Sequence, residues 1–213
     1  MKPKRLHSLL MPALALCLCS LPAVAGPVLF SDLGPPGNLD DCCTGWTVSG
    51  WGAFGTSYTS ANLFTVAGSG SFSVTEIDLG VSNMGGNPDT FYAGIWTDNY
   101  DSPWSPVAGA YWNPLYATTI LGNCCALVSI TGITGVTLTG GQQYFMLAGP
   151  LDTSDDSWNA WTWNTQGVTG DVQYSTDSGD TWNDLGSSTL GAFESSVARP
   201  FRSPALCSCS EPD

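Results

Sequence analysis

Two groups of closely spaced aspartates are candidates for metal binding or acid–base catalysis. Asp152, Asp155 and Asp156 form one group, and Asp98 and Asp101 form the other. Carboxylates at this density suit Ca²⁺, a hard cation that takes about six to eight oxygen ligands. Neither spacing is that of an EF-hand, and a solvated loop is the alternative because aspartate is common in turns. The sequence therefore predicts no cofactor, with one calcium candidate at Asp152, Asp155 and Asp156.

Paired carboxylates could also hydrolyse glycosides, with one acid donating a proton and the other acting as base or nucleophile. The chain has 18 acidic residues, so some of them come close together by chance. Residues 26–198 contain no Lys, Arg or His. Serine and threonine therefore have no ordinary base to activate them, and phosphates have no cationic surface to bind. We expect a protein that is not an enzyme and has no nucleic-acid partner.

Tryptophan offers a different chemistry, because exposed indole rings stack on the apolar faces of sugars. The chain has 9 Trp, and burial in a core is the more frequent role of this side chain. Trp161 and Trp163 alternate as core residues would. Trp104, Tyr111 and Trp112 lie in a Pro-rich stretch and are the best candidates for an exposed glycan-binding surface.

The most specific local motif is the Asp-box pattern S-x-D-x-G-x-T-W, which is known from sialidase-like propellers and other secreted β proteins. Its residues here are Ser175, Asp177, Gly179 and Trp182. The aspartate can accept backbone N–H groups within its own turn, and glycine permits a positive φ. A sialidase site would also need an arginine cluster and a tyrosine nucleophile, so we interpret the motif as a rigid structural turn.

The cysteines indicate the compartment. Exported chains meet an oxidising environment, where an even number of thiols favours disulfides. Adjacent cysteines lack the usual spacing of zinc ligands. We expect disulfides, of unspecified pairing, among the two doublets Cys42, Cys43, Cys124 and Cys125, with Cys207 and Cys209 as a further pair of cysteines.

The elements that position these residues are expected to be short strands. Apolar stretches alternate with turn residues, and no window after the N-terminus keeps a helical period for ten residues without Gly or Pro. The side-chain alternation slips near Glu76, as a β-bulge would cause. The pattern predicts an all-β, single-domain antiparallel β-sandwich of jelly-roll type. Strands are predicted, among others, at 28–31, 46–51, 63–67, 117–121, 127–131 and 136–138.

The two ends of the chain are expected to lie outside this domain. Residues 1–25 have a basic start, an apolar run and a small-residue ending, which is typical of a secretory signal peptide. The domain is predicted at 26–198, and 199–213 form an unstructured tail. After residue 25 there are two arginines and 18 acidic residues, a formal charge of −16. That part has no apolar segment long enough to span a bilayer.

Several segments, taken in order, resemble a family of exported bacterial proteins described as choice-of-anchor domains, which often carry a PEP-CTERM sorting signal. The matching segments are 30–35, 45–50, 136–145, 158–164, the Asp-box and 190–194. The resemblance implies a surface or matrix protein attached through an exchangeable C-terminal device. No PEP-CTERM sorting helix is present in the residues up to Asp213.

These observations favour a non-catalytic extracellular or cell-surface β-sandwich with a structural, matrix or adhesive role, secreted by or displayed on a bacterium. A carbohydrate-binding module using exposed Trp or Tyr is the alternative, and an Asp/Glu-based glycoside hydrolase is the third. Extracellular polysaccharide or envelope components are the expected partners.

Overall fold

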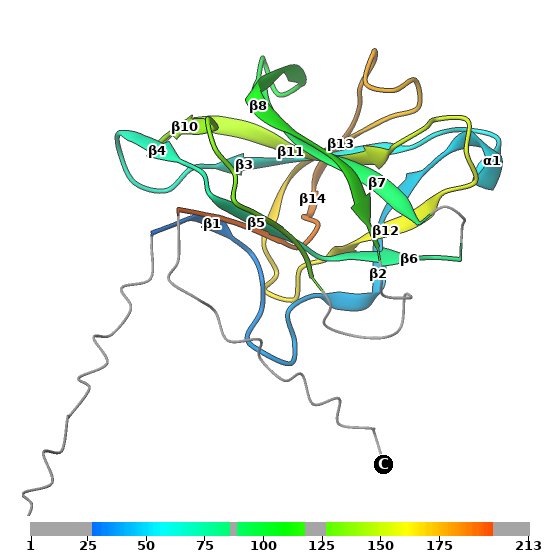
Figure 1. Cartoon of the computed structure of the whole chain (residues 1–213), viewed down its shortest axis with the longest axis horizontal. Helices are drawn as coiled ribbons and strands as arrows, with labels where there is room; N and C mark the ends of the chain where they lie inside the picture. Colours follow the sequence, from blue (N-terminus) through cyan, green and yellow to red (C-terminus); the bar gives the residue numbers. More distant parts are fainter. Residues whose placement is uncertain (1–26, 86–88, 118–126, 198–213) are drawn as a thin grey trace, which may run out of the picture.

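The computed structural model describes residues 27–85, 89–117 and 127–197, and these residues are almost entirely β-structure (Figure 1). The predicted all-β fold is confirmed. The elements are β1 (Val28–Ser31), β2 (Asp41–Ser49), α1 (Trp51–Phe54), β3 (Thr59–Thr65), β4 (Ser71–Ser73), β5 (Glu76–Leu79), β6 (Val81–Asn83), β7 (Thr90–Asp98), β8 (Pro103–Tyr116), β9 (Val128–Thr131), β10 (Thr137–Thr139), β11 (Gln143–Pro150), β12 (Trp158–Trp163), β13 (Thr169–Ser175), β14 (Asn183–Thr189) and β15 (Phe193–Ser196).

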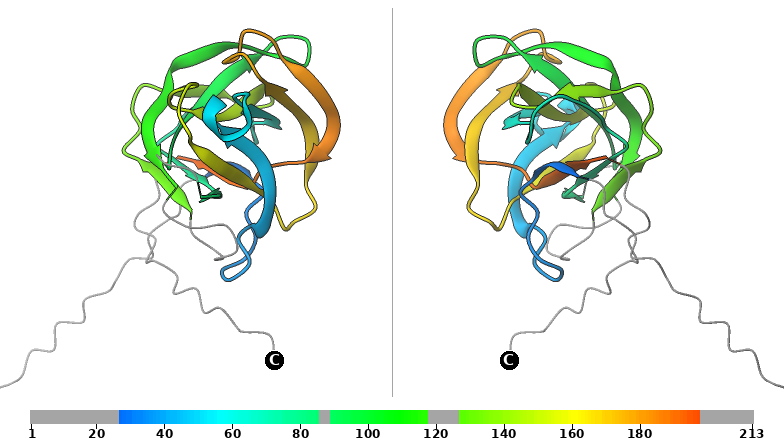
Figure 2. Two further views of the ribbon diagram at one scale, coloured as in Figure 1. Left: turned by 90° about the vertical axis from the view of Figure 1, so that its right-hand side faces the viewer. Right: turned by 90° about the vertical axis from the view of Figure 1, so that its left-hand side faces the viewer.

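One layer of the sandwich is a six-stranded antiparallel sheet in the order β14-β13-β3-β11-β7-β8. Two further strands, β4 and β10, pair with each other. Next to them, the hydrogen bond from Val66 N–H to Gln142 O, at 3.0 Å, joins the residue after β3 to the turn that precedes β11. Viewed along the long axis of the domain, this large sheet curves over the other layer (Figure 2).

The second layer consists of two sheets, β1-β15-β5-β9 and β2-β12-β6. They meet at Gly80, between β5 and β6. Gly80 N–H donates to Ala192 O at 2.9 Å, and Gly80 O accepts from Thr162 N–H at 2.7 Å. A Cβ at Gly80 would lie 2.5 Å from Thr162 Oγ1, so the close approach of the strands requires glycine here.

The prediction of a β-bulge near Glu76 is wrong. The side-chain alternation slips there because the chain leaves one sheet and enters another. Strand β4 pairs with β10, whereas β5 pairs with β15 and β9 without a register shift. Most of the predicted strands listed above lie in β1, β2, β3, β9 and β10, with ends shifted by a few residues. The strand predicted at 117–121 lies largely outside the described residues.

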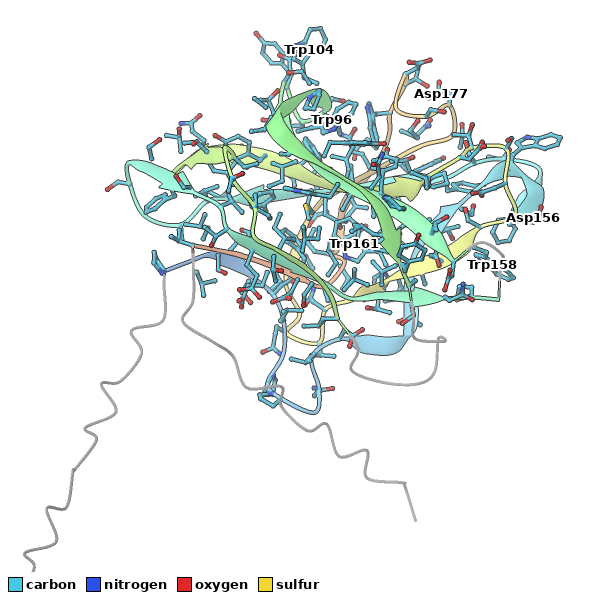
Figure 3. The ribbon with its side chains drawn as sticks, in the orientation of Figure 1. Trp96, Trp104, Asp156, Trp158, Trp161 and Asp177 are labelled. Carbon is cyan, nitrogen blue, oxygen red and sulfur yellow. The ribbon has the colours of Figure 1, made fainter. Side chains whose placement is uncertain are left out.

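The main core lies between the layers. Phe91, Ile95 and Met146 point inward from the large sheet, and Trp161 and Phe193 point inward from the second layer; all five side chains are fully buried. Trp161 lies at the centre of the domain (Figure 3), and its indole N–H donates to Ala192 O at 3.1 Å. Alternating inward positions on paired strands therefore form one continuous apolar interior.

The outer face of the large sheet also carries a buried cluster. Phe145 and Leu147 are fully buried there, and Trp96 and Trp182 pack against them with ring centroids 6.2 Å apart. The β7–β8 loop covers part of this face, since Ser102 Oγ donates to Gln173 Oε1 at 3.2 Å. No helix in the described residues is long and apolar enough to cross a membrane.

Candidate functional site

An open groove of about 320 Å³ lies where three segments distant in sequence meet. One wall is α1 and the residues that follow it, another is the loop between β11 and β12, and the third is the Asp-box turn between β13 and β14. Labelled residues of two walls, Asp156 and Asp177, lie at the same end of the domain as α1 (Figures 1 and 3). The lining side chains are Trp51, Ser57, Thr153, Ser154, Thr176, Asp177 and Ser178.

Hydrogen bonds hold the backbone at Trp51, whereas its side chain projects outward and leaves the residue 60% exposed. Trp51 N–H donates to Thr153 O at 2.6 Å, and Gly52 N–H donates to Asp155 O at 2.9 Å. Gly50 and Gly52 carry no side chain because a Cβ on either would collide with Asp155 or Asp156. The glycines on both sides of Trp51 thus let the β11–β12 loop approach the turn closely and fix the backbone from which the ring projects.

Aromatic residues support α1 from behind. The Phe54 ring packs edge-on against Trp158 with centroids 4.9 Å apart and against Tyr58 at 6.3 Å. Tyr58 in turn lies 6.1 Å from Tyr174 of β13. This packing anchors the helix to the sandwich without covering Trp51.

The predicted calcium ligands do not converge. Asp152 Oδ1 accepts hydrogen bonds from the backbone N–H and the hydroxyl of Ser154, at 2.8 and 2.7 Å, and these lower the pKa of Asp152. Asp155 Oδ1 accepts Ser157 N–H at 2.8 Å. Across residues 27–85, 89–117 and 127–197, no three His, Cys, Asp or Glu side chains are grouped so as to hold a metal ion. Asp152 and Asp155 accept hydrogen bonds within their own loop, and calcium at Asp152, Asp155 and Asp156 stays a prediction.

The Asp-box residues form a tightly hydrogen-bonded turn. Asp177 Oδ1 accepts from Ser175 Oγ at 2.7 Å and from Thr181 N–H at 2.9 Å, and Asp177 Oδ2 accepts from Thr181 Oγ1 at 2.6 Å. Hydrogen bonds from Thr181, then Ser175, lower the pKa of Asp177 to about 2. Gly179 has φ +93°, and a Cβ there would lie 3.5 Å from the Trp182 ring. This geometry agrees with a structural turn, and it also places a permanent anion in the groove wall.

The predicted glycan-binding residues do not form one platform. Trp104 is 69% exposed and lies beside the β7–β8 loop (Figure 3), and Tyr111 is 48% exposed. Trp112 is partly buried against the main core, so its proposed role is corrected. The reason is alternation along β8, which directs adjacent side chains to opposite faces.

A carboxyl pair lies on β13 and β14. Burial, and then a hydrogen bond and the charge of Asp184, raise the pKa of Asp171. Glycosidases separate their two carboxyl groups by about 5 Å or more to admit the glycosidic oxygen or a water molecule. A directly hydrogen-bonded pair leaves no such space, so this pair does not have a glycosidase's geometry.

Two carboxyl groups are buried under the second layer. Phe193 N–H donates to Asp32 Oδ1 at 2.6 Å, yet burial raises the pKa of Asp32 to about 7. Asp40 Oδ2 lies 2.5 Å from Thr162 Oγ1, which lies 2.6 Å from Gly80 O. Burial raises the pKa of Asp40 as well, and the hydrogen bond donated by the Thr162 hydroxyl opposes this with a smaller effect.

The cysteine prediction lies outside the part described. Cys42 and Cys43 belong to β2, but their side chains, and Cys124 and Cys125 altogether, are not among the described residues. The disulfides therefore stay a prediction.

The sequence could have indicated the groove only through Gly50-Trp51-Gly52, a tryptophan between two glycines. A scan of family models, a search of curated proteins and a search of solved structures returned no match to the chain.

Proposed function

We propose that this protein is a non-catalytic, extracellular or cell-surface β-sandwich with an adhesive role, and that it attaches to polysaccharide at the groove around Trp51. This proposal joins the structural or adhesive role expected from the sequence with its carbohydrate-binding alternative. The predicted signal peptide and the resemblance to choice-of-anchor domains support the location.

The single observation that carries the proposal is an exposed indole ring, on a hydrogen-bonded backbone, beside several hydroxyl groups. Trp51 is 60% exposed, and Ser57, Thr153 and Ser154 are among its neighbours in the groove. Sugars present an apolar face of C–H groups and a rim of hydroxyls, so one ligand can stack on the ring and hydrogen-bond to the rim. Because hydrogen bonds hold the backbone at Trp51, no loop has to be ordered there when a ligand binds.

The chemistry of the groove supports binding without turnover. A general acid at neutral pH needs a raised pKa, and that of Asp177 is lowered to about 2. Its three hydrogen bonds from Ser175 and Thr181 belong to the turn itself. The sequence supplies no His, Lys or Arg between residues 26 and 198 to act instead.

The test is polysaccharide binding by a matched pair of tryptophan variants. Trp51 and Trp104 are both well exposed, at 60% and 69%, but only Trp51 lines the groove. On a glycan array and in affinity electrophoresis, we expect Trp51→Ala to lose binding by at least about tenfold and Trp104→Ala to retain it. Binding lost in Trp104→Ala alone would move the site to β8, and a wild-type protein that binds no glycan would refute the proposal.

A further inference from the structure

The charge on the groove points to a particular class of sugar. Asp177 is ionised far below neutral pH, and on the facing loop the pKa of Asp152 is also lowered. Residues 27–85, 89–117 and 127–197 include no Lys, Arg or His, so no cationic side chain in the described part offsets these anions. A ligand entering the groove therefore meets an uncompensated negative potential.

The hydrogen-bonding capacity of the groove also favours a ligand that carries donors. The Ser154 hydroxyl donates its hydrogen to Asp152 Oδ1 at 2.7 Å, and the Ser57 hydroxyl donates to Thr176 O at 3.3 Å. These two oxygens can then only accept. Asp177 Oδ2 receives one hydrogen bond, from Thr181 at 2.6 Å, and keeps a free acceptor site. The groove surface thus presents the carboxylate of Asp177 and two hydroxyl oxygens that can only accept.

We propose that the groove selects a polysaccharide of amino sugars with free, protonated amines, such as glucosamine units, over neutral or uronic-acid polymers. This inference rests on the proposed function and names its ligand. An ammonium group has three donors and no acceptor, which matches the carboxylate of Asp177 and the accept-only oxygens of Ser57 and Ser154, whereas a sugar hydroxyl both donates and accepts. The exposed face of Trp51 attracts the same cation through its π electrons. A uronate would be repelled by Asp177 and Asp152.

The experiment compares hexasaccharides of one backbone, so that the ligands differ only in the substituent at C2 or in the carboxylate at C6. Binding of the full mature protein is measured by calorimetry to a glucosamine hexamer, its N-acetylated form, a glucose hexamer and a uronic-acid hexamer. At about pH 5.5 and low salt, we expect the glucosamine hexamer to bind at least about tenfold more tightly than the other three.

The pH dependence of binding shows whether the preference for the glucosamine hexamer comes from the charge on its amines. The titratable residues on the elements around the groove are Asp152, Asp155, Asp156, Tyr58, Asp177 and Asp180. The pKa values of Asp177 and Asp152 are lowered, so both carboxylates stay charged from about pH 5.5 to about pH 9, while the amine of the sugar loses its proton. We expect the preference to disappear at about pH 9, where the glucosamine hexamer should bind like the glucose hexamer.

Variants separate recognition from non-specific attraction. Asp177→Asn and Asp180→Asn change the net charge equally, but only Asp177 lines the groove. We expect about a tenfold loss in Asp177→Asn and less than a twofold change in Asp180→Asn, with unchanged circular dichroism. Trp51→Ala, which keeps every charge, should lose at least about tenfold.

Each outcome has one meaning. Equal affinity for the amine and N-acetyl hexamers, with dependence on Trp51, would overturn the amino-sugar inference and leave the proposed function standing. Amine binding that survives Trp51→Ala would be non-specific charge attraction and would overturn the inference. Failure to bind any of the four hexamers would overturn the amino-sugar inference, and only a lack of binding across the glycan array would overturn the proposed function as well.

Discussion

Asp32 and Asp40 are carboxyl groups buried at a junction of strands, where most proteins place apolar side chains. Asp32 accepts the Phe193 amide of β15, and Asp40 contacts Thr162 of β12. Both therefore tie the connection between β1 and β2 to the second layer. Since burial raises the pKa of each, both favour the protonated form in the folded protein.

The stability of the protein should therefore fall as pH rises. The pKa of Asp32 is about 7 in the folded protein and 3.8 as its ordinary value, so between these values the folded state binds more protons. The contribution is fully present below about pH 4 and is lost by about pH 7. In urea unfolding, the stability of Asp32→Asn relative to wild type should increase by roughly 2 to 4 kcal/mol between about pH 4.5 and pH 8. A pH-independent difference would contradict this assignment.

At the scale of single residues, the sequence predicted the Asp-box turn and missed Trp51. The turn was predictable because Ser175, Asp177, Gly179 and Thr181 interact with one another over a few residues. The groove joins residues 51–57, 153–154 and 176–178, and which loops meet depends on the pairing of whole strands. Local pattern carries no information about that pairing.

Among the elements, β8 was not predicted as a strand because Pro103, Pro106 and Pro114 interrupt it. Proline cannot donate to a ladder, but β8 lies at an edge of the large sheet, where one side needs no partner. Register shifts against β7 accommodate the irregularities. The prolines also protect the exposed edge from pairing with other chains.

The junction between β12 and the segment before β15 depends on Gly191. A Cβ there would lie 2.6 to 2.7 Å from three atoms of the buried Trp161 ring. We expect Gly191→Ala to lower the free energy of unfolding by about 3 kcal/mol, since overpacking forces the ring or the strand to move. The measurement is urea or thermal unfolding followed by tryptophan fluorescence.

Gly132→Ala is the control for this prediction. Gly132 has φ +70° and open space around its Cα, so alanine there costs only backbone strain, about 1 kcal/mol. Equal effects of the two substitutions would mean that crowding against Trp161 is not what requires glycine at position 191.

For the whole molecule, alternating apolar residues and frequent turn residues were enough to predict the β-sandwich class. They were not enough to predict how its sheets are arranged. Glu76 illustrates the difference. The slip in alternation there was visible in the sequence, but a bulge and a transfer to another sheet give the same local pattern. Only the pairing of β5 with β15, more than 100 residues later, distinguishes them.

Disulfides are the remaining prediction at this scale. The doublets at 42–43 and 124–125 are about 80 residues apart, and a bridge closing such a loop stabilises a fold by roughly 4 kcal/mol. In protein secreted into an oxidising compartment and unfolded without reductant, we expect no reactive thiols, and a lower melting temperature after reduction. Six free thiols per chain would contradict the prediction.

Because β1 and β15 pair antiparallel, with Val28 opposite Ser196, the described domain begins and ends at one corner, away from α1 (Figure 1). A pull between these two ends loads the ladder one hydrogen bond at a time, so the strands unzip at low force. If the groove holds a polymer as proposed, a pull between α1 and either end instead runs along the length of the sandwich in Figure 1 and is shared by many strands. We therefore expect the domain to resist unfolding better when force is applied between the β1–β15 corner and α1 than when it is applied between the two ends.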